Sequence, residues 1–131
     1  MQRARRTAEI AGFASPNLTP LLSEVDYGRY EGMTTKAIQE SRPGWELYRD
    51  GCPGGETSQE IYARAMGFIA LVSTARGRVL AFAHGHILRA VAVAWMSLDI
   101  TAASRLALDV ATISVLRHDE HGQVLALWNA P

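Results

Sequence analysis

The sequence is nearly devoid of cysteine. Cys52 stands alone among 131 residues, so neither an intramolecular disulfide nor a multi-cysteine zinc site can form. Its neighbours, in the stretch Gly-Cys-Pro-Gly-Gly, are typical of a turn rather than of a catalytic thiol beside a base. A single thiol fits a reducing, cytoplasmic setting.

Long apolar runs and an excess of charge are also missing. The most apolar stretch, residues 79–83 (VLAFA), ends at His84, far short of the roughly 18 residues that cross a bilayer. Thirteen basic and thirteen acidic residues cancel, and the N-terminal residues lack the apolar stretch of a secretory signal. We therefore expect neither a membrane nor a nucleic acid as partner.

What is present is the composition of a globular protein. Hydrophobic residues make up 48% of the chain and charged residues 20%. A chain of 131 residues has the usual size of one domain and can bury about two thirds of its unfolded surface. We expect residues 1–131 to form a single domain.

Helical and strand patterns alternate along the chain, which is typical of the α/β class. The clearest helix is 58–75, where Thr57 and Glu60 match a capping box. The continuously apolar run 79–83 predicts a central strand buried on both faces. The other expected elements are a helix from Gln2 to about residue 11, a helix at about 35–41, a helical turn at 45–49, a helix at 87–98 and a terminal hairpin that turns at 119–122.

The junction between the predicted strand 79–83 and the following helix contains His84, Gly85 and His86. A helix N-terminus offers free backbone donors and a positive dipole to a phosphate, and Gly85 permits close approach of the backbone. A histidine there can also bond a phosphoryl oxygen. The alternative is a capping or core histidine; a metal pair of His84 and His86 lacks a third ligand.

Charged residues near the N-terminus are the other candidates. Glu24 and Asp26 lie in a glycine-punctuated loop, where a carboxylate can act as an acid or base or can simply be solvated. Helical spacing separates Arg3 from Arg5 and Arg6, which favours one phosphate ligand and two surface charges.

Four motifs occur in order: Arg3-Ala-Arg-Arg-Thr-Ala, Glu24-Val-Asp-Tyr-Gly-Arg-Tyr-Glu-Gly, Gly54-Gly-Glu-Thr and Ala83-His-Gly-His. In this order and spacing the chain resembles the phosphoglycerate-mutase-like histidine phosphatases, in particular their small bacterial acid phosphatases.

That resemblance implies a phosphohistidine mechanism that needs no metal or other cofactor and acts on a small phosphorylated substrate. Arg3 resembles the pocket arginine, and His84 the second histidine, which stabilises phosphoryl oxygens with Gly85 beside it. Glu24 resembles the proton donor to the leaving alkoxide. Glu56 lies near the pocket in relatives, although helix capping explains it equally well.

One motif of the family is missing. The four histidines are His84, His86, His118 and His121, and no Arg-His-Gly triplet, which carries the nucleophile in relatives, is present. We therefore expect the C-terminal portion of a three-layer α/β/α sandwich without its N-terminal strands. The chain is then either a truncated gene product or one with a misassigned start, with Met1 an internal methionine.

Two hypotheses follow from the missing motif. In the first, a longer native protein is a phosphomonoesterase, and the present chain alone is inactive. In the second, the chain is a non-catalytic remnant with weak phosphate binding or an interaction role. A mutase-type phosphoryl transfer also stays open, as does association between copies through an uncovered sheet edge.

Overall fold

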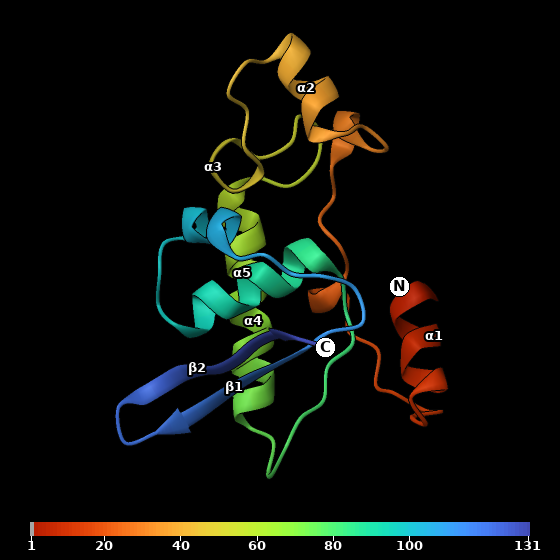
Figure 1. Cartoon of the computed structure of the whole chain (residues 1–131), viewed down its shortest axis with the longest axis vertical. Helices are drawn as coiled ribbons and strands as arrows, with labels where there is room; N and C mark the ends of the chain where they lie inside the picture. Colours follow the sequence, from red (N-terminus) through yellow and green to blue (C-terminus); the bar gives the residue numbers. More distant parts are fainter. Residues whose placement is uncertain (1) are drawn as a thin grey trace.

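The computed structural model describes residues 2–131; Met1, and with it the question of the start, lies outside the described residues. α-Helices and one β-hairpin make up most of the ordered structure (Figure 1). The α-helices are α1 (Gln2–Ile10), α2 (Thr35–Ser41), α3 (Leu47–Asp50), α4 (Ser58–Ser73) and α5 (Gly85–Trp95). Three short 3-10 helices are η1 (Pro20–Leu22), η2 (Gly28–Tyr30) and η3 (Ile100–Arg105), and the strands are β1 (Ile113–Asp119) and β2 (Gly122–Ala130).

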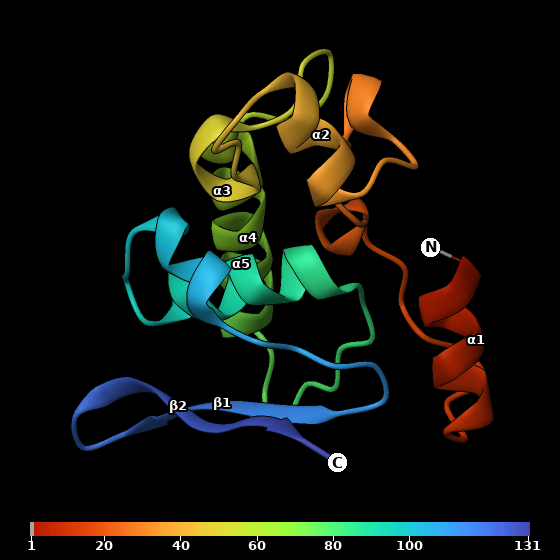
Figure 2. The same ribbon diagram turned by 45° about the horizontal axis from the view of Figure 1, so that its top comes forward.

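The core forms where α4 crosses α5 (Figure 2). In α4, Ile61 and Ala65 are four residues apart and fully buried, as the apolar stripe predicts. In α5, Ile87, Ala90 and Val93 follow helical spacing and are equally buried. The prediction of α4 is confirmed together with its capping box. Thr57 Oγ1 accepts from the Glu60 amide, and the Glu60 carboxylate accepts from the Thr57 amide.

The predicted N-terminal helix is confirmed as α1, which both views show beside the body of α4 and α5 (Figures 1 and 2). Ala8 is its buried residue. Gly12 follows the helix with φ +94°, a left-handed conformation that suits glycine and ends the helix.

The predicted terminal hairpin is also confirmed. β1 and β2 pair antiparallel, with Asp119 opposite Gly122 at the turn. Trp95 at the end of α5 donates from Nε1 to the Val124 carbonyl at 3.1 Å and packs edge-on against His118. The hairpin is therefore attached to α5 through this tryptophan.

The prediction of a central strand at 79–83 is wrong for this structure. Within residues 2–131 the sheet consists of β1 and β2 alone, and 79–83 is an extended segment without a ladder partner. Val79 and Leu80 are about half exposed, at 51% and 59%. An apolar segment of this kind becomes a buried strand only when strands pair with it on both sides, and the described residues supply none.

Helix α5 begins at Gly85, after His84, rather than at 87, and it ends at Trp95 rather than near 98.

Within the described part of the chain, no helix has the length and apolarity that crossing a bilayer requires.

Candidate active site

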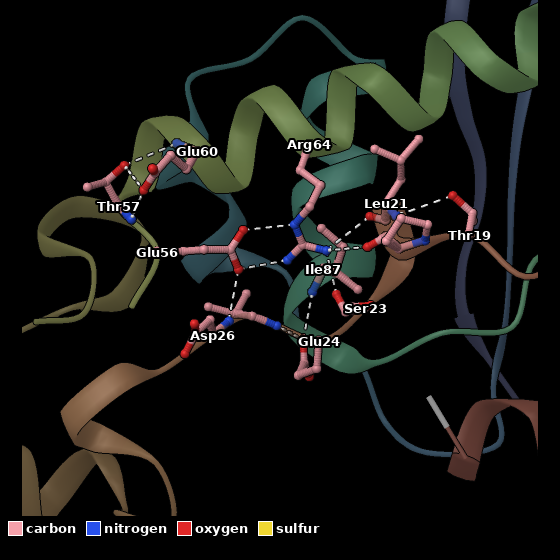
Figure 3. Close-up of polar contacts among 12 residues, drawn as sticks. Thr19, Leu21, Ser23, Glu24, Asp26, Glu56, Thr57, Glu60, Arg64 and Ile87 are labelled. Atoms are coloured by element: carbon pink, nitrogen blue, oxygen red, sulfur yellow. Dashed lines mark hydrogen bonds and ion pairs between the residues drawn. The ribbon is translucent and has the colours of Figure 1, made fainter. Parts of the chain in front are cut away.

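Glu24 lies against the N-terminus of α5 (Figure 3). Its Oε1 accepts hydrogen bonds from the amide of Ile87 at 3.1 Å and from that of Val25 at 3.0 Å. Its Oε2 accepts from the amide of His86 at 3.3 Å. A carboxylate is a favourable partner for these amides, because the first amides of a helix have no acceptor within the helix. The loop residue that the sequence identified as a candidate acid is thus brought to the helix start more than sixty positions further on.

His84 is the residue directly before α5, in an extended conformation with φ −120° and ψ 161°. Its side chain makes no capping hydrogen bond, so the capping alternative is wrong. Its Nε2 is buried and bonds to no partner in the described chain. Burial lowers the pKa of His84, nearby Glu24 acts in the opposite direction, and the positive charge of Arg3 lowers the pKa further. A neutral ring with an unused nitrogen is available to a ligand.

Arg3 lies on the exposed surface of α1, close enough to His84 for its charge to affect that histidine. Arg5 and Arg6 both form ion pairs with Glu9, at 3.1 and 3.2 Å. Arg5 and Arg6 are thus surface charges, as the helical spacing predicts, and a phosphate role for Arg3 stays a prediction.

Gly85 begins α5. A Cβ placed there would have only the Arg89 Nη2, at 4.0 Å, as a neighbour. Packing of the described residues therefore does not require glycine at this position. The space beside its backbone remains open to a ligand.

Sequence reasoning treated His86 only as half of a metal pair, yet it is a central residue of the site. Its Nδ1 lies 2.5 Å from the hydroxyl of Tyr27 and 3.9 Å from Glu24 Oε2. Its carbonyl accepts from the hydroxyl of Tyr48 at 2.9 Å. Burial lowers the pKa of His86 and raises those of both tyrosines. The ring is therefore neutral near pH 7, and the tyrosines are protonated donors.

His86 also lines a cavity of about 470 Å³. Tyr27, Tyr30 and Trp45 contribute aromatic walls, and Arg89 contributes a cation. The combination of apolar walls with a few polar groups is typical of small-molecule sites. In the sequence, the features that could have indicated this cavity are Tyr27 and Tyr30, three positions apart, and His86, the second histidine of His-Gly-His.

Two other candidates have structural roles. Asp26 Oδ1 accepts from the Gly28 amide at 2.9 Å and so stabilises the turn after Glu24. Glu56 does not cap α4, because Thr57 and Glu60 do so; it forms an ion pair with Arg64 instead, with Arg64 Nε 2.8 Å from Glu56 Oε1. Among residues 2–131 no cluster of three potential metal ligands is found.

The arrangement brings a carboxylate and two histidines to one helix N-terminus. A helix N-terminus is suited to an anion, and a carboxylate there can exchange a proton with a ligand. These are the parts that metal-independent phosphoryl transfer requires, apart from a nucleophile.

Comparisons with known proteins agree with this chemistry. Residues 1–131 match the histidine phosphatase superfamily (branch 1). An acid phosphatase of Mycobacterium tuberculosis is 40% identical over 123 residues, which cover 92% of this chain and 60% of that protein. The sedoheptulose 1,7-bisphosphatase of Saccharomyces cerevisiae is 38% identical over 96 residues, 60% of this chain and 35% of that protein.

Among solved structures, that of an open reading frame from Mycobacterium tuberculosis superimposes with a TM-score of 0.93 at 37% identity, covering 98% of this chain and 68% of that one. The fold is therefore that of the phosphoglycerate-mutase-like α/β phosphatases. The chain belongs to the histidine phosphatase superfamily, and it spans about 60% of the length of the mycobacterial acid phosphatase it matches.

Proposed function

We propose that this chain is the acid- and phosphate-binding part of a phosphomonoester hydrolase that works through a phosphohistidine intermediate. The observation that carries the proposal is the contact of the Glu24 carboxylate with the first amides of α5, immediately after His84. In the proposal this carboxylate is the proton donor, and its position beside a helix start suited to phosphate supports that role. The proposed substrate is a small phosphorylated molecule, and the proposed setting is the cytoplasm.

In the proposed reaction, a histidine nitrogen attacks phosphorus and the bond from phosphorus to the leaving oxygen breaks. The Glu24 carboxyl gives its proton to that oxygen, so an alcohol departs. Water then attacks the phosphorus of the phosphohistidine and its proton passes to Glu24. The phosphorus–nitrogen bond breaks, so inorganic phosphate leaves and the free histidine is restored. Arg3, His84 and the amide of Gly85 would hold the phosphoryl oxygens as charge develops on them.

The sequence contains no Arg-His-Gly triplet, the motif that carries the nucleophilic histidine in this scheme. We therefore expect the 131-residue chain by itself to show no turnover of an aryl phosphate above background. A measurable rate that is abolished by His84→Ala in a well-folded variant would show that a surviving histidine serves as nucleophile, and the scheme would then be wrong.

The DNA upstream of the Met1 codon gives an independent test. An in-frame segment that encodes Arg-His-Gly would support a longer phosphatase, whereas a stop codon directly upstream would leave the non-catalytic alternative for this locus.

The acid role is tested in such a longer protein by Glu24→Gln. Because glutamine cannot donate the proton, kcat/KM should fall by roughly 100-fold or more for a poor leaving group such as an alkyl alcohol and far less for nitrophenol. Arg5→Lys, which changes a surface ion pair, is the matched control. Equal losses for good and poor leaving groups would contradict the acid role.

A further inference from the structure

Residues 21–26, the segment that carries Glu24, are hydrogen-bonded to the ion pair of Arg64 and Glu56, which has low exposure. Arg64 on α4 donates from Nε to Glu56 Oε1 and from Nη2 to Glu56 Oε2, both at 2.8 Å. Their side chains are 16% and 18% exposed. A bidentate pair with so little water around it has a fixed geometry and fixes its other partners as well.

Those other partners lie on both sides of Glu24 (Figure 3). On the N-terminal side, Arg64 Nη1 donates to the carbonyls of Leu21 at 3.1 Å and Ser23 at 2.6 Å. On the C-terminal side, Glu56 Oε2 accepts from the amide of Asp26 at 2.8 Å. Only Glu24 and Val25 separate the two attachment points.

Val25 also restrains the backbone between the two attachment points. Its side chain is 3% exposed and belongs to the core. The backbone of Glu24 is thus held on both sides, and its carboxylate accepts from the amides of His86 and Ile87.

We infer that Arg64 and Glu56 are positioning residues that hold the Glu24 carboxylate at the N-terminus of α5. The inference rests on the proposed acid role of Glu24 and adds the contacts that hold its backbone in place for that role. Neither residue touches the site; both act through the backbone of residues 21–26. Acid catalysis depends on a proton donor within hydrogen-bond reach of the leaving oxygen, so a loosened backbone would cost rate without loss of the acid itself.

The test uses the 131-residue chain and needs no turnover. In a ¹⁵N-labelled sample, the amide shift of Ile87 should titrate with the Glu24 carboxylate when pH is varied between about 3 and 8. Glu24→Gln should abolish that titration and so assign it. Hydrogen exchange at the amides of His86 and Ile87 gives a second measure of the same contact.

Arg64→Lys keeps the charge but cannot bond Glu56 in a fork and two carbonyls together. We expect it to lower the amplitude of the Ile87 titration by about half or more and to speed exchange at His86 and Ile87 about tenfold. Exchange at buried amides in the middle of α5, such as that of Val91, should stay unchanged. Arg49→Lys, at an exposed ion pair with Asp50, is the control and should change neither measure.

Full titration and unchanged exchange in Arg64→Lys would overturn the inference. A uniform loss of protection through α5 would overturn it as well, because it would show a general role in stability. Should Arg64→Lys fail to fold, Glu56→Gln decides by the same criteria, since it keeps one acceptor oxygen for Asp26 and removes the charge together with one acceptor of the fork to Arg64. A correctly placed Glu24 that fails the leaving-group test would refute the proposed function and leave this inference intact.

Discussion

Gly55 is a position where one added methyl group should displace the segment that follows Glu24. A Cβ at Gly55 would lie 2.3 Å from the Asp26 carbonyl oxygen and 2.5 Å from the Gly28 amide nitrogen. Both are backbone atoms, which cannot rotate away as a side chain can. We therefore expect Gly55→Ala to push the loop 52–56 away from the segment that follows Glu24.

The size of the effect follows from these contacts. To restore van der Waals distance, the two backbones must separate by about 1 Å. The Glu56 amide bond to the Asp26 carbonyl, 2.9 Å, and the Asp26 amide bond to Glu56 Oε2, 2.8 Å, would then stretch. Overpacking costs about 1–3 kcal/mol and loss of each of the two bonds about 1 kcal/mol, so the free energy of unfolding should fall by about 3–5 kcal/mol.

Urea unfolding followed by tryptophan fluorescence measures this loss, and two other glycines calibrate it. Gly44 has φ +76° and no atom within 4 Å of its virtual Cβ, so Gly44→Ala should cost only about 1 kcal/mol for the left-handed backbone. Gly67 lies inside α4, 3.4 Å from a movable Leu21 methyl, so Gly67→Ala should be neutral or stabilising by up to about 1 kcal/mol. If Gly55→Ala lowers the free energy of unfolding no more than Gly44→Ala does, the close contact between Gly55 and the backbone of Asp26 and Gly28 would be refuted.

The remaining predictions concern titration and reactivity. We expect the Tyr27 hydroxyl to donate to His86 Nδ1, so that in ¹⁵N spectra near neutral pH His86 carries its proton on Nε2. Tyr27→Phe should then mix the tautomers, and a protonated Nδ1 in the unaltered chain would contradict the assignment. Burial lowers the pKa values of His84 and His86, so the unfolded chain binds protons at a pH where the folded one does not. The free energy of unfolding should therefore decrease as pH falls through about 6.5 towards 5, with a shallower slope in His86→Gln; a urea midpoint that rises over this window would oppose the reasoning. Burial raises the pKa of Cys52 to about 11, so a thiol reagent at pH 7 should react with it slowly until urea unfolds the chain, and immediate labelling of the folded protein would count against its burial.

Features encoded by neighbouring residues were predictable from the sequence. The capping box of α4 requires only Thr57 and Glu60, three positions apart, and the hairpin requires only a polar turn between apolar strands. The helical stripe of α4 likewise depends on side chains within two turns of one another. In each case the energy that decides the structure is local.

Features that depend on distant partners were predictable only in part. Residues 79–83 have the composition of a buried strand, but strand formation requires hydrogen bonds from neighbouring strands, and the described residues provide none. Residue type identified Glu24 and His84 as candidates, whereas the contact of Glu24 with the amides of α5 emerges only from the folded chain. Arg64 has no sequence signature, because its partners are mostly backbone carbonyls of residues 20–23.

The charge balance at the start of α5 connects the fold with the proposed chemistry. Glu24 already occupies the amides of His86 and Ile87, so a phosphate at this helix would be left with the Gly85 amide, the unused His84 nitrogen and the Arg3 guanidinium. The phosphate dianion and the carboxylate would then lie side by side at one helix N-terminus. Two anions in such proximity repel, and a proton on one of them relieves the repulsion. In the proposed mechanism Glu24 gives its proton to the leaving oxygen, so the position of its carboxyl group beside the phosphate is what the reaction requires. On the inference made above, the ion pair of Arg64 and Glu56 would hold the carboxylate in place against that repulsion.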